Sequence, residues 1–508
     1  MRRPIRELFA ALPEGVLTRA AHWDRVQDAP ISALCYDSRL ATEGTVFFCL
    51  VGKTLDGHGY AESAYRKGCR FFVAQRNIHL PEDATVLSVP DTRAAMADCA
   101  AAFYGHPERE MRLVGLTGTK GKTTTALLIQ GLLTAAGIPA GYIGTNGVDY
   151  AGYHFDTVNS TPESVEIYRH LRGMLDAGVK VCALEVSSQA LWMGRIRGLV
   201  FDSVLFLNLS RDHIGGVEHP TMEHYRDCKR LLFSDYPAKA VIANADDGTT
   251  AFMTEGVASP VQTFSTRTPT AHWYASEIRS AKIGDRPGVT FTARRRGEAV
   301  GGSWFLPLPG EYNVQNALAA LSVVCDRFGV EPHRAGALLA EATVSGRFET
   351  VTSPALPNVT FIIDYAHNGV SLTSVLDTLR EYGPKRLICL FGSVGGRTRE
   401  RRKDLAKAAA YRADLCVLTA DNPASEPVMD IIREIDSYFP ADGCHRLWEP
   451  DREAAIRMLV EKAQAGDIIL LAGKGHETYQ LIGTRRVPFS EKEILREALR
   501  EKALAGIV

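Results

Sequence analysis

The sequence lacks an excess of either charge. Its 508 residues contain 58 Lys and Arg against 59 Asp and Glu, which gives a formal net charge of −1. Without a large polybasic surface, binding to nucleic acid or to an anionic membrane is not expected. No run approaches the roughly 18 consecutive apolar residues of a membrane-spanning helix. At the amino end, Arg6 and Glu7 interrupt the apolar core that a signal peptide requires.

Cysteine is sparse and scattered. Ten cysteines lie between Cys35 and Cys444, with no CxxC pair and no regular spacing. This distribution does not indicate a disulfide framework or a zinc site, and it favours buried thiols in a reducing compartment. The sequence also has no low-complexity tract and no repeat of fixed period. At roughly 150 residues per domain, it predicts a cytoplasmic enzyme of about three domains.

Apolar runs that alternate with helical patterns predict parallel α/β units in two parts of the chain. In the first part, LVGLT predicts a buried strand, followed by a glycine-rich turn and a helix over 123–136. Residues 255–310 are instead rich in short β patterns. After SGRFE, at 345–349, a second alternation predicts a doubly wound sheet with ligands at the carboxyl ends of its strands. The predicted domains are 1–108, 109–345 and 346–508.

The segment LVGLTGTKGKTTTALLI, residues 113–129, predicts a phosphate-binding loop between a strand and a helix. Backbone N–H groups at the helix N-terminus can cradle phosphates, while Lys122 neutralises charge and Thr123 offers a hydroxyl to Mg²⁺. Five residues stand between Gly115 and Gly121 where the general pattern has four, so the loop takes the compact form GTKGKT. A glycine-rich turn with a surface lysine is the simpler alternative, but it leaves the agreement of strand, glycines, lysine, threonines and helix unexplained.

Acidic and imidazole side chains follow other predicted strands of the same domain. Glu185 ends one strand, and Asp212 and His213 follow another. Such groups can bind Mg²⁺ near a nucleotide, directly or through water. His213 alone also fits a hydrogen-bonded turn histidine, and Lys229 alone fits a solvated helix lysine. The phosphate loop by itself leaves a kinase, a GTPase, a motor and a ligase open, although the DxxG and NKxD patterns of a GTPase switch have no convincing place.

Eight motifs occur in the order seen in the Mur ligases: GTKGKTT, EVSSQAL, RDHIGGVEHPTMEHYRDCK, YNVQNALAA, SGRFE, DYAHNG, DNPA and GKGHE. The chain resembles this family over nearly its whole length, and within it the branch that adds the third amino acid. In addition, YDSR and VGKTLDGHGY are similar to the family's nucleotide-sugar domain. The resemblance implies an α/β architecture of three domains: an N-terminal UDP-binding domain, a central P-loop ATPase domain with a parallel sheet, and a C-terminal Rossmann-like domain.

The resemblance also implies an activity. Such a protein is a cytoplasmic, monomeric, ATP-dependent ligase of peptidoglycan synthesis, and so of cell wall biogenesis, cell shape and cell division. It extends UDP-N-acetylmuramoyl-L-alanyl-D-glutamate with a free amino acid through an acyl phosphate. The implied cofactors are ATP, Mg²⁺ and a CO₂-derived carbamate on Lys229, which turns a cation into an anion able to bridge the metal. Another ligation step of the family, or a folylpolyglutamate-type ligase, is the alternative.

Individual residues match the family's functional positions. The matches to ATP contacts are Gly118, Thr119, Lys120, Gly121, Lys122, Thr123, Thr124, Asn316 and Arg347. The matches to catalytic and metal-binding positions are Lys122, Thr123, Glu185, His213 and Lys229. The matches to UDP-muramoyl-dipeptide contacts are Ser38, Lys53, Thr54, Leu55, Asn159, Ser160, Thr161, Ser187 and Arg195. The matches to amino-acid contacts are Arg397, Asp421, Asn422, Pro423, Ala424, Gly473 and Glu477. Thr161-Pro162-Glu163 also fits a helix N-cap with proline at the first helical position.

Three departures from the family's common pattern concern the substrates. DHIGGVEHPTMEHY is longer than DHLDYHGTMENY, DYAHNGVSL replaces DYAHTPDAL, and Met193 stands where glutamine is frequent. The longer loop and the HNG variant resemble a branch that uses L-lysine. Members that select meso-diaminopimelate typically have DNPR, whose arginine can pair with the distal carboxylate, whereas Ala424 stands here. L-lysine is therefore the predicted amino acid, with meso-diaminopimelate, paired by a residue such as Arg399, and ornithine as alternatives.

Overall fold

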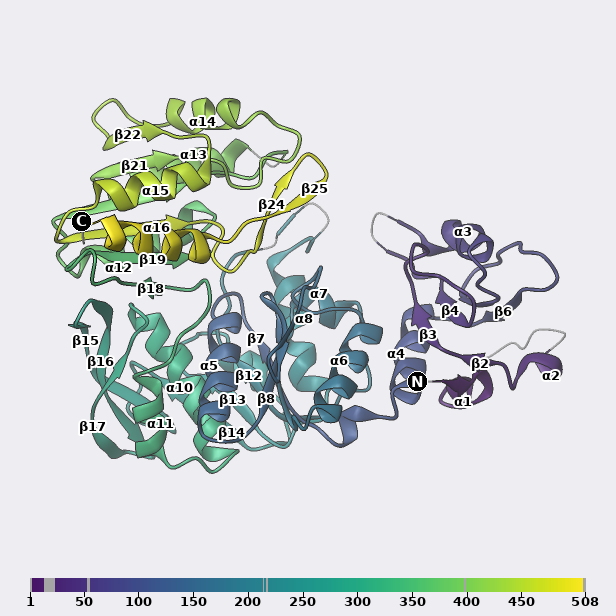
Figure 1. Cartoon of the computed structure of the whole chain (residues 1–508). Coiled ribbons are helices and arrows are strands. Elements are labelled where there is room, and N and C mark those ends of the chain that lie inside the picture. The colour runs from purple at the N-terminus through teal and green to yellow at the C-terminus, as the bar shows by residue number, and fades with distance from the viewer. Residues whose placement is uncertain are drawn as a thin grey trace. The chain divides into compact units, whose positions relative to one another are not determined.

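The computed structural model describes residues 2–12, 23–52, 55–212, 214–215, 218–396 and 399–505. The chain divides into two compact units, Met1–His272 with Ala319–Val330, and Trp273–Leu318 with Glu331–Val508. In Figure 1 the chain is coloured from purple at the amino end to yellow at the carboxyl end. Among the described residues, no helix combines the length and apolar character needed to cross a membrane. All ten cysteines are free thiols and nine are buried, as the sequence predicts.

The first unit begins with a small parallel sheet of order β3-β4-β5-β6. Its strands are mostly apolar, as expected where both faces of a sheet are covered. Phe47 and Phe72 lie in a core on one face, whereas Phe48 and Val73 lie in a core with the helices on the other. The elements are β1 (Arg3–Pro4), α1 (Ile5–Phe9), α2 (Trp23–Val26), β2 (Pro30–Ile31), β3 (Ala33–Cys35), β4 (Thr45–Phe48), η1 (Gly57–Tyr60), α3 (Ala61–Arg66), β5 (Phe71–Ala74), β6 (Thr85–Ser88), α4 (Thr92–Phe103) and η2 (Pro107–Arg109).

The larger sheet of this unit has the order β10-β9-β8-β11-β7-β12-β13-β14. Strand β7 lies between β11 and β12 and is parallel to both, so the carboxyl ends of these three strands meet at one edge. The elements are β7 (Arg112–Thr117), α5 (Lys122–Ala135), β8 (Ala140–Gly144), β9 (Gly147–Tyr150), β10 (Tyr153–Phe155), α6 (Ser164–Asp176), β11 (Val181–Glu185), α7 (Ser188–Trp192), β12 (Phe201–Phe206), α8 (Met222–Ser234), β13 (Val241–Asn244), α9 (Thr250–Thr254) and β14 (Val261–Ser265). The predicted strand–turn–helix is confirmed.

One local prediction is wrong. Helix α6 begins at Ser164 with Glu163 as the residue that precedes it, so Pro162 lies outside the first helical turn. The Thr161 hydroxyl does not cap this helix; it donates to the backbone oxygen of Glu185 at 2.8 Å. The Thr161 hydroxyl therefore binds the backbone of Glu185, the last residue of β11, whose side chain is the predicted metal-binding carboxylate.

The second unit contains an antiparallel meander and a mostly parallel sheet of order β18-β19-β23-β20-β21-β22. The meander, β15 (Trp273–Ile283), β16 (Arg286–Arg295) and β17 (Glu298–Leu306), accounts for the predicted β-rich stretch. The remaining elements are α10 (Glu311–Asp326), α11 (Pro332–Leu339), β18 (Glu349–Val351), β19 (Thr360–Asp364), α12 (Gly369–Arg380), β20 (Arg386–Phe391), α13 (Arg399–Ala410), β21 (Leu415–Leu418), α14 (Val428–Ser437), β22 (His445–Trp448), α15 (Arg452–Lys462), β23 (Asp467–Ala472), β24 (Tyr479–Ile482), β25 (Arg485–Pro488) and α16 (Glu491–Ala505).

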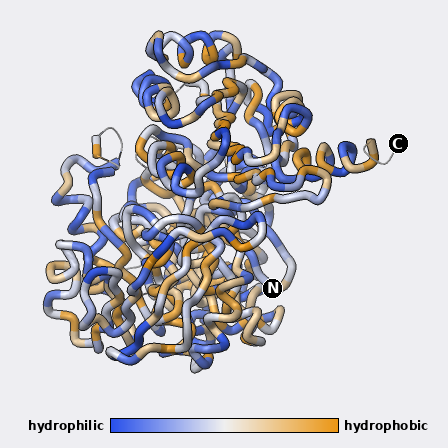
Figure 2. The backbone as a smooth tube through the Cα atoms, turned by 90° about the vertical axis from the view of Figure 1, so that its left-hand side faces the viewer, coloured by the Kyte–Doolittle hydropathy of each residue, from blue (hydrophilic) through white to orange (hydrophobic). Residues whose placement is uncertain are grey.

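Helices α15 and α16 cover one face of this second sheet and lie side by side in Figure 1. Ile456 and Leu495 pack there against Ile363 and Leu471 of the strands. Near the carboxyl end, α16 shows alternating orange and blue bands, the pattern of a helix with one buried side (Figure 2). The alternation of strands and helices predicted for this part of the chain is confirmed.

Candidate active site

The predicted phosphate loop occupies the four residues between β7 and α5. Gly121 has φ +85°, a left-handed conformation directly before the helix. A Cβ on Gly118 would lie 3.0 Å from the Leu207 Cβ and 3.2 Å from the Asn208 backbone nitrogen. Both positions therefore favour glycine. Gly121 does so because of its left-handed conformation, and Gly118 because the residues that follow β12 come close to it. The first N–H groups of a helix have no acceptor within it, so the start of α5 is suited to hold an anion.

The segment after β12 braces this loop from the side. The Asn208 side chain accepts from the Lys120 backbone nitrogen at 2.9 Å and donates to the Lys120 oxygen at 3.1 Å. The Thr119 hydroxyl accepts from the Ser210 nitrogen at 2.9 Å and donates to its oxygen at 3.2 Å. The Tyr225 hydroxyl donates to Thr119 as well, at 3.2 Å. These hydrogen bonds hold the loop in one conformation. In the sequence, the feature that could have predicted them is the segment NLS, residues 208–210, with Asn and Ser after an apolar strand.

Two lysine side chains converge on one carbonyl of the loop. Lys122 donates to the Gly118 oxygen at 2.7 Å and to the Thr119 oxygen at 3.2 Å. Lys229, only 1% exposed, donates to the same Gly118 oxygen at 2.9 Å. Burial lowers the pKa of Lys229 well below its ordinary value, and the Lys122 cation lowers this pKa further. The alternative that Lys229 is a solvated helix lysine is therefore wrong.

Glu185 ends β11 with a fully buried carboxylate. One of its oxygens accepts from the Tyr142 hydroxyl at 2.5 Å and the Thr145 nitrogen at 3.0 Å, and the other accepts from the Thr145 hydroxyl at 3.1 Å. These bonds fix the carboxylate while leaving it capacity for a further partner. Thr123, a second predicted metal-binding residue, is buried at the start of α5. Carboxylate and hydroxyl oxygens fit Mg²⁺, whereas the amine of an unmodified Lys229 does not.

Four of the five residues predicted to hold the muramoyl-dipeptide lie together beside Glu185. The Ser187 nitrogen donates to the Thr161 hydroxyl at 3.0 Å, and Arg195 donates to the Thr161 backbone oxygen at 3.1 Å. The Ser160 and Thr145 hydroxyl oxygens are 2.8 Å apart, so Ser160 can donate to Thr145 while Thr145 donates to Glu185. The fifth residue, Asn159, is half-buried. The structure thus gathers these side chains from three separate segments of the first unit.

The remaining residues predicted for the nucleotide-sugar end belong to the small N-terminal sheet region. Ser38 follows β3 and is buried, whereas Leu55 is 63% exposed. Four predicted site residues lie outside the described residues: Lys53, Thr54, His213 and Arg397.

The predicted nucleotide contacts Asn316 and Arg347 belong to the second unit. Asn316 donates to the Asn313 side chain at 3.1 Å. The Arg347 guanidinium lies 4.9 Å from the centre of the Tyr365 ring, which also contacts His476 at 4.8 Å. Neither Tyr365 nor His476 was predicted to have a separate role, although they belong to the motifs DYAHNG and GKGHE at the ends of strands.

Most residues predicted to bind the amino acid surround a buried lysine that was not predicted. Lys474 is fully buried and donates to Glu477 at 2.8 Å and to Asn422 at 3.1 Å. Its ammonium lies 3.9 Å from Asp421. Gly473 has φ +111°, and a Cβ there would lie 3.3 Å from the Asp421 carboxylate. The available signal was the sequence GKGHE, a lysine between two glycines directly after an apolar strand.

Ala424 is joined by its backbone to the hairpin β24–β25. Its nitrogen donates to the Leu481 oxygen at 2.9 Å, and its oxygen accepts from the Gly483 nitrogen at 2.7 Å. Ala424 pairs with Ile482, and Ile482 pairs in turn with Arg485. Ala424 also has φ +51°, which L-residues rarely adopt, and Pro423 precedes it as a buried residue. Arg399, the alternative partner for a distal carboxylate, is 82% exposed and lies 3.6 Å from Glu434.

A braced phosphate loop, a helix N-terminus and a fixed carboxylate at one sheet edge define a P-loop nucleotide-binding α/β protein. Three family models identify it further. The Mur ligase family catalytic domain matches residues 30–104, the Mur ligase middle domain matches 116–324, and the Mur ligase glutamate ligase domain matches 346–475. The chain belongs to the Mur ligase family, and the predicted three-domain α/β architecture is confirmed.

Named relatives identify the branch. The UDP-N-acetylmuramoyl-L-alanyl-D-glutamate–2,6-diaminopimelate ligase of Geobacillus thermodenitrificans (strain NG80-2) is 37% identical over 481 residues, 93% of this chain and 95% of the relative. The ligase of that name from Clostridium perfringens (strain 13 / Type A) is 33% identical, covering 94% and 96%. A solved structure of a ligase of that name aligns with TM-score 0.67 and 26% identity over 99% of this chain and all of the other.

The fold is shared more widely than the branch. A MurF structure from Acinetobacter baumannii aligns with TM-score 0.65 at 18% identity, covering 98% of this chain and 99% of the other. The predicted membership in the tripeptide-forming branch of the family is confirmed by the sequence relatives. The predicted preference for L-lysine has no support among them, because these relatives carry diaminopimelate in their names.

Proposed function

We propose that this chain joins a free amino acid to UDP-N-acetylmuramoyl-L-alanyl-D-glutamate with the use of ATP, and that the amino acid is meso-diaminopimelate. The observation that carries the ligase proposal is the convergence of Lys122 and Lys229 on Gly118, at the same sheet edge as the fixed carboxylate of Glu185. The named relatives support the amino acid. We also propose functional domains 1–108, 109–345 and 346–508, which contain the three family matches.

In the proposed reaction, a carboxylate of the dipeptide attacks the γ-phosphate of ATP, which forms an acyl phosphate and releases ADP. The amine of the incoming amino acid then attacks the acyl carbon, and phosphate leaves from a tetrahedral intermediate. Two anions meet in the first step, so Lys122 and the N–H groups at the start of α5 must offset their repulsion. Mg²⁺, held by Thr123 and Glu185, would neutralise further phosphate charge.

Lys229 is proposed to carry a carbamate. Its buried amine has a lowered pKa, so a larger neutral fraction is available at neutral pH than for a surface lysine. The neutral nitrogen adds to CO₂, forms an N–C bond and releases one proton, and the product is an anion with two oxygens. These oxygens supply the hard ligands that the unmodified amine lacks. The carbamate also removes a positive charge from the neighbourhood of Lys122.

This proposal predicts that Lys229→Ala reduces ligation at least about 100-fold, the order of magnitude for loss of one charge-stabilising group. Formate or acetate should restore part of the activity, because a small carboxylate can replace the carbamate oxygens. The measurement is phosphate release with and without added carboxylate, with Lys239→Ala, an exposed lysine of the same unit, as the matched control. Full activity of Lys229→Ala without carboxylate would contradict the carbamate.

The choice of amino acid depends on what faces its distal end. A second carboxylate buried without a partner would cost several kcal/mol. The Ala424 side chain offers no partner for such a carboxylate. L-lysine, which lacks it, is therefore the second candidate, and ornithine is the third. However, the pairing of Ala424 with Ile482, and of Ile482 with Arg485, brings an arginine into the neighbouring hairpin strand. An arginine there supports meso-diaminopimelate despite the alanine.

A panel of amino acids tests the proposal directly. Phosphate release is measured with ATP, UDP-N-acetylmuramoyl-L-alanyl-D-glutamate and, in turn, meso-diaminopimelate, L-lysine and L-ornithine. The expected result is the highest kcat/KM for meso-diaminopimelate and no sustained release when the dipeptide is omitted. A higher kcat/KM for L-lysine would overturn the amino-acid assignment alone. Release that is independent of the dipeptide would overturn the ligase proposal.

A further inference from the structure

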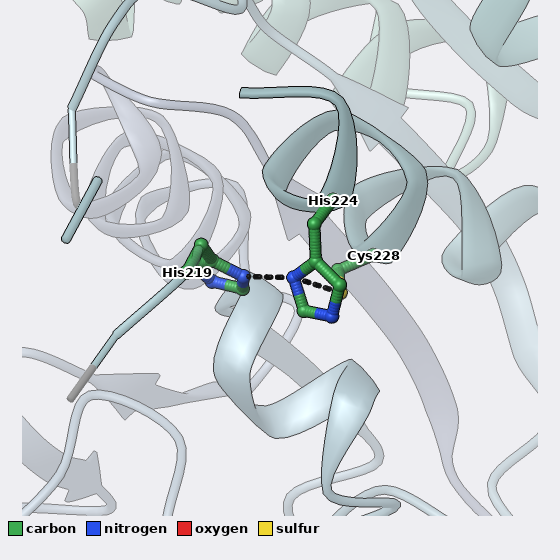
Figure 3. A group of neighbouring side chains, drawn as sticks. All are labelled: His219, His224 and Cys228. Carbon is green, nitrogen blue, oxygen red and sulfur yellow. Dashed lines mark hydrogen bonds between the residues drawn. The ribbon is translucent and has the colours of Figure 1, made fainter. Parts of the chain in front are cut away.

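Three soft ligand atoms meet in the first unit, outside the phosphate loop. His224 and Cys228 are one turn apart on α8, and His219 reaches them from the preceding loop (Figure 3). The Nδ1 atoms of His219 and His224 are 2.9 Å apart, and the Cys228 Sγ lies 3.6 Å from the His224 Nδ1. His219 is 2% exposed and Cys228 is 5% exposed. All three ligand atoms lie within 4.8 Å of one another.

We propose that His219, His224 and Cys228 bind a zinc ion. Two imidazoles and one thiolate are the donors that zinc prefers, and Mg²⁺ does not compete well for nitrogen and sulfur. Tetrahedral zinc with ordinary bond lengths places its sulfur about 3.6 Å and its second nitrogen about 3.3 Å from the first nitrogen. The Cys228–His224 separation already has this value. The two Nδ1 atoms need to move apart by about 0.4 Å, and the ligand atoms of His219 and Cys228, which lie within 4.8 Å of each other, need to approach to about 3.6 Å.

The surroundings of His219 support the same assignment. Its Nε2 lies 2.9 Å from the Ser188 hydroxyl, so the ring is anchored at one nitrogen while Nδ1 faces the other two ligands. A metal-binding histidine commonly has such a partner at its second nitrogen, which fixes the orientation and tautomer of the ring. Trp192 meets the His224 ring edge-on at 5.1 Å and shields it from one side. Three protein ligands leave a fourth position for water.

The position of this zinc site gives it a structural role near the reaction centre. Cys228 directly precedes Lys229, and Ser188 follows Ser187 at the start of α7. A bound ion would therefore tie the loop before α8 to both helices. Asp212 lies earlier in the connection between β12 and α8, and its carboxylate is 3.1 Å from the Lys120 ammonium of the phosphate loop. Zinc would hold this segment in place without itself contacting phosphate.

Cobalt(II) provides a readout that does not depend on catalysis. Added to the metal-free full-length protein, Co²⁺ should give a thiolate-to-metal absorption band and the intense visible bands of tetrahedral coordination, and one equivalent of Zn²⁺ should remove both. Zn²⁺ should also raise the unfolding temperature. A millimolar excess of Mg²⁺ should leave the cobalt spectrum unchanged, which separates this site from the proposed Mg²⁺ position.

Two variants and one control locate the ligands. Cys228→Ser should lose the thiolate band, and His224→Ala, a change at a partly exposed ring, should weaken Zn²⁺ affinity at least tenfold. Cys444→Ser, which removes the one thiol of the ten that is not fully buried, should leave both results unchanged. Circular dichroism checks that each variant is folded. Absence of the band in the wild type, or its retention in folded Cys228→Ser, would overturn the proposal and leave a hydrogen-bonded Ser188–His219–His224 chain.

Discussion

Lys122 and Lys229 show how burial separates two side chains of the same type. Both ammonium groups lie within 3 Å of the Gly118 oxygen, yet only Lys229 is fully buried. Burial lowers the pKa of Lys229, and the charge of the neighbouring Lys122 lowers this pKa further, which favours the neutral form of Lys229. The difference in burial therefore gives the two lysines different chemical environments at the same carbonyl.

Lys122→Ala is expected to reduce ADP formation at least about 100-fold at saturating substrates, because the loop loses the charge that offsets two meeting anions. The fold should persist, since the backbone of residues 118–121 is held by the segment after β12. Circular dichroism and the unfolding temperature serve as the check on folding, and Lys239→Ala is again the matched control. Turnover near the wild-type rate would remove the phosphate-loop assignment.

The burial of His170 predicts that the free energy of unfolding decreases at acidic pH. Its ring is 4% exposed, lies 5.0 Å from the Phe155 ring and is 3.3 Å from the Arg169 guanidinium. Burial, helped by that charge, lowers the pKa of His170 from 6.5 to about 4. Between these values the unfolded chain binds the proton and the folded chain does not. Folding therefore loses stability as pH falls from about 6.5 to about 4, by about 3 kcal/mol in total.

The replacement His170→Phe removes this titration while keeping an aromatic ring. Urea unfolding of wild type and variant is compared at pH 7.5, 5.5 and 4.5. The wild type should lose more stability than the variant, and the difference should grow toward the lower pH. An equal loss in both proteins would show that His170 is protonated in the folded state at an ordinary pKa.

Helix α8 carries two pairs of residues with proposed roles, because side chains four residues apart lie on the same face of a helix. Tyr225 and Lys229 are four residues apart and both reach the phosphate loop, while His224 and Cys228 have the same spacing on an adjoining face. The scattered cysteines did not indicate a zinc site in the sequence. Cysteine spacing takes no account of histidines, so it does not reveal a set of two histidines and one cysteine.

The hairpin β24–β25 carries a prediction about specificity. If Arg485 pairs with the distal carboxylate of meso-diaminopimelate, Arg485→Ala removes a charge-assisted interaction of about 2 kcal/mol and raises KM for this amino acid about thirtyfold. The KM for L-lysine, which lacks that carboxylate, should change little. Arg500→Ala, an exposed arginine of α16, is the control. Equal effects of Arg485→Ala on both amino acids would argue against a specific contact.

Across the whole molecule, the features that could be predicted from the sequence are those that depend on neighbouring residues. Alternating apolar runs predicted the strands and helices of both α/β sheets, and Gly118–Thr123 predicted the phosphate loop, since these features depend on neighbours a few residues away. The helix start near Thr161 was wrong because a long-range contact with β11 determined the hydroxyl's partner instead of local capping.

The sequence by itself determined the family, the order of strands and helices, and most of the side chains that could meet a nucleotide. Only the tertiary structure decided the burial of Lys229 and the lowering of its pKa, the enclosure of Lys474 by Asn422 and Glu477, and the meeting of His219 with His224 and Cys228. The contacts of Lys229 with Gly118 and of Lys474 with Asn422 join separate segments, whereas the His219 set depends on how the chain turns into α8. Desolvation and hydrogen bonding arise from that three-dimensional arrangement, and spacing along the chain does not encode them locally.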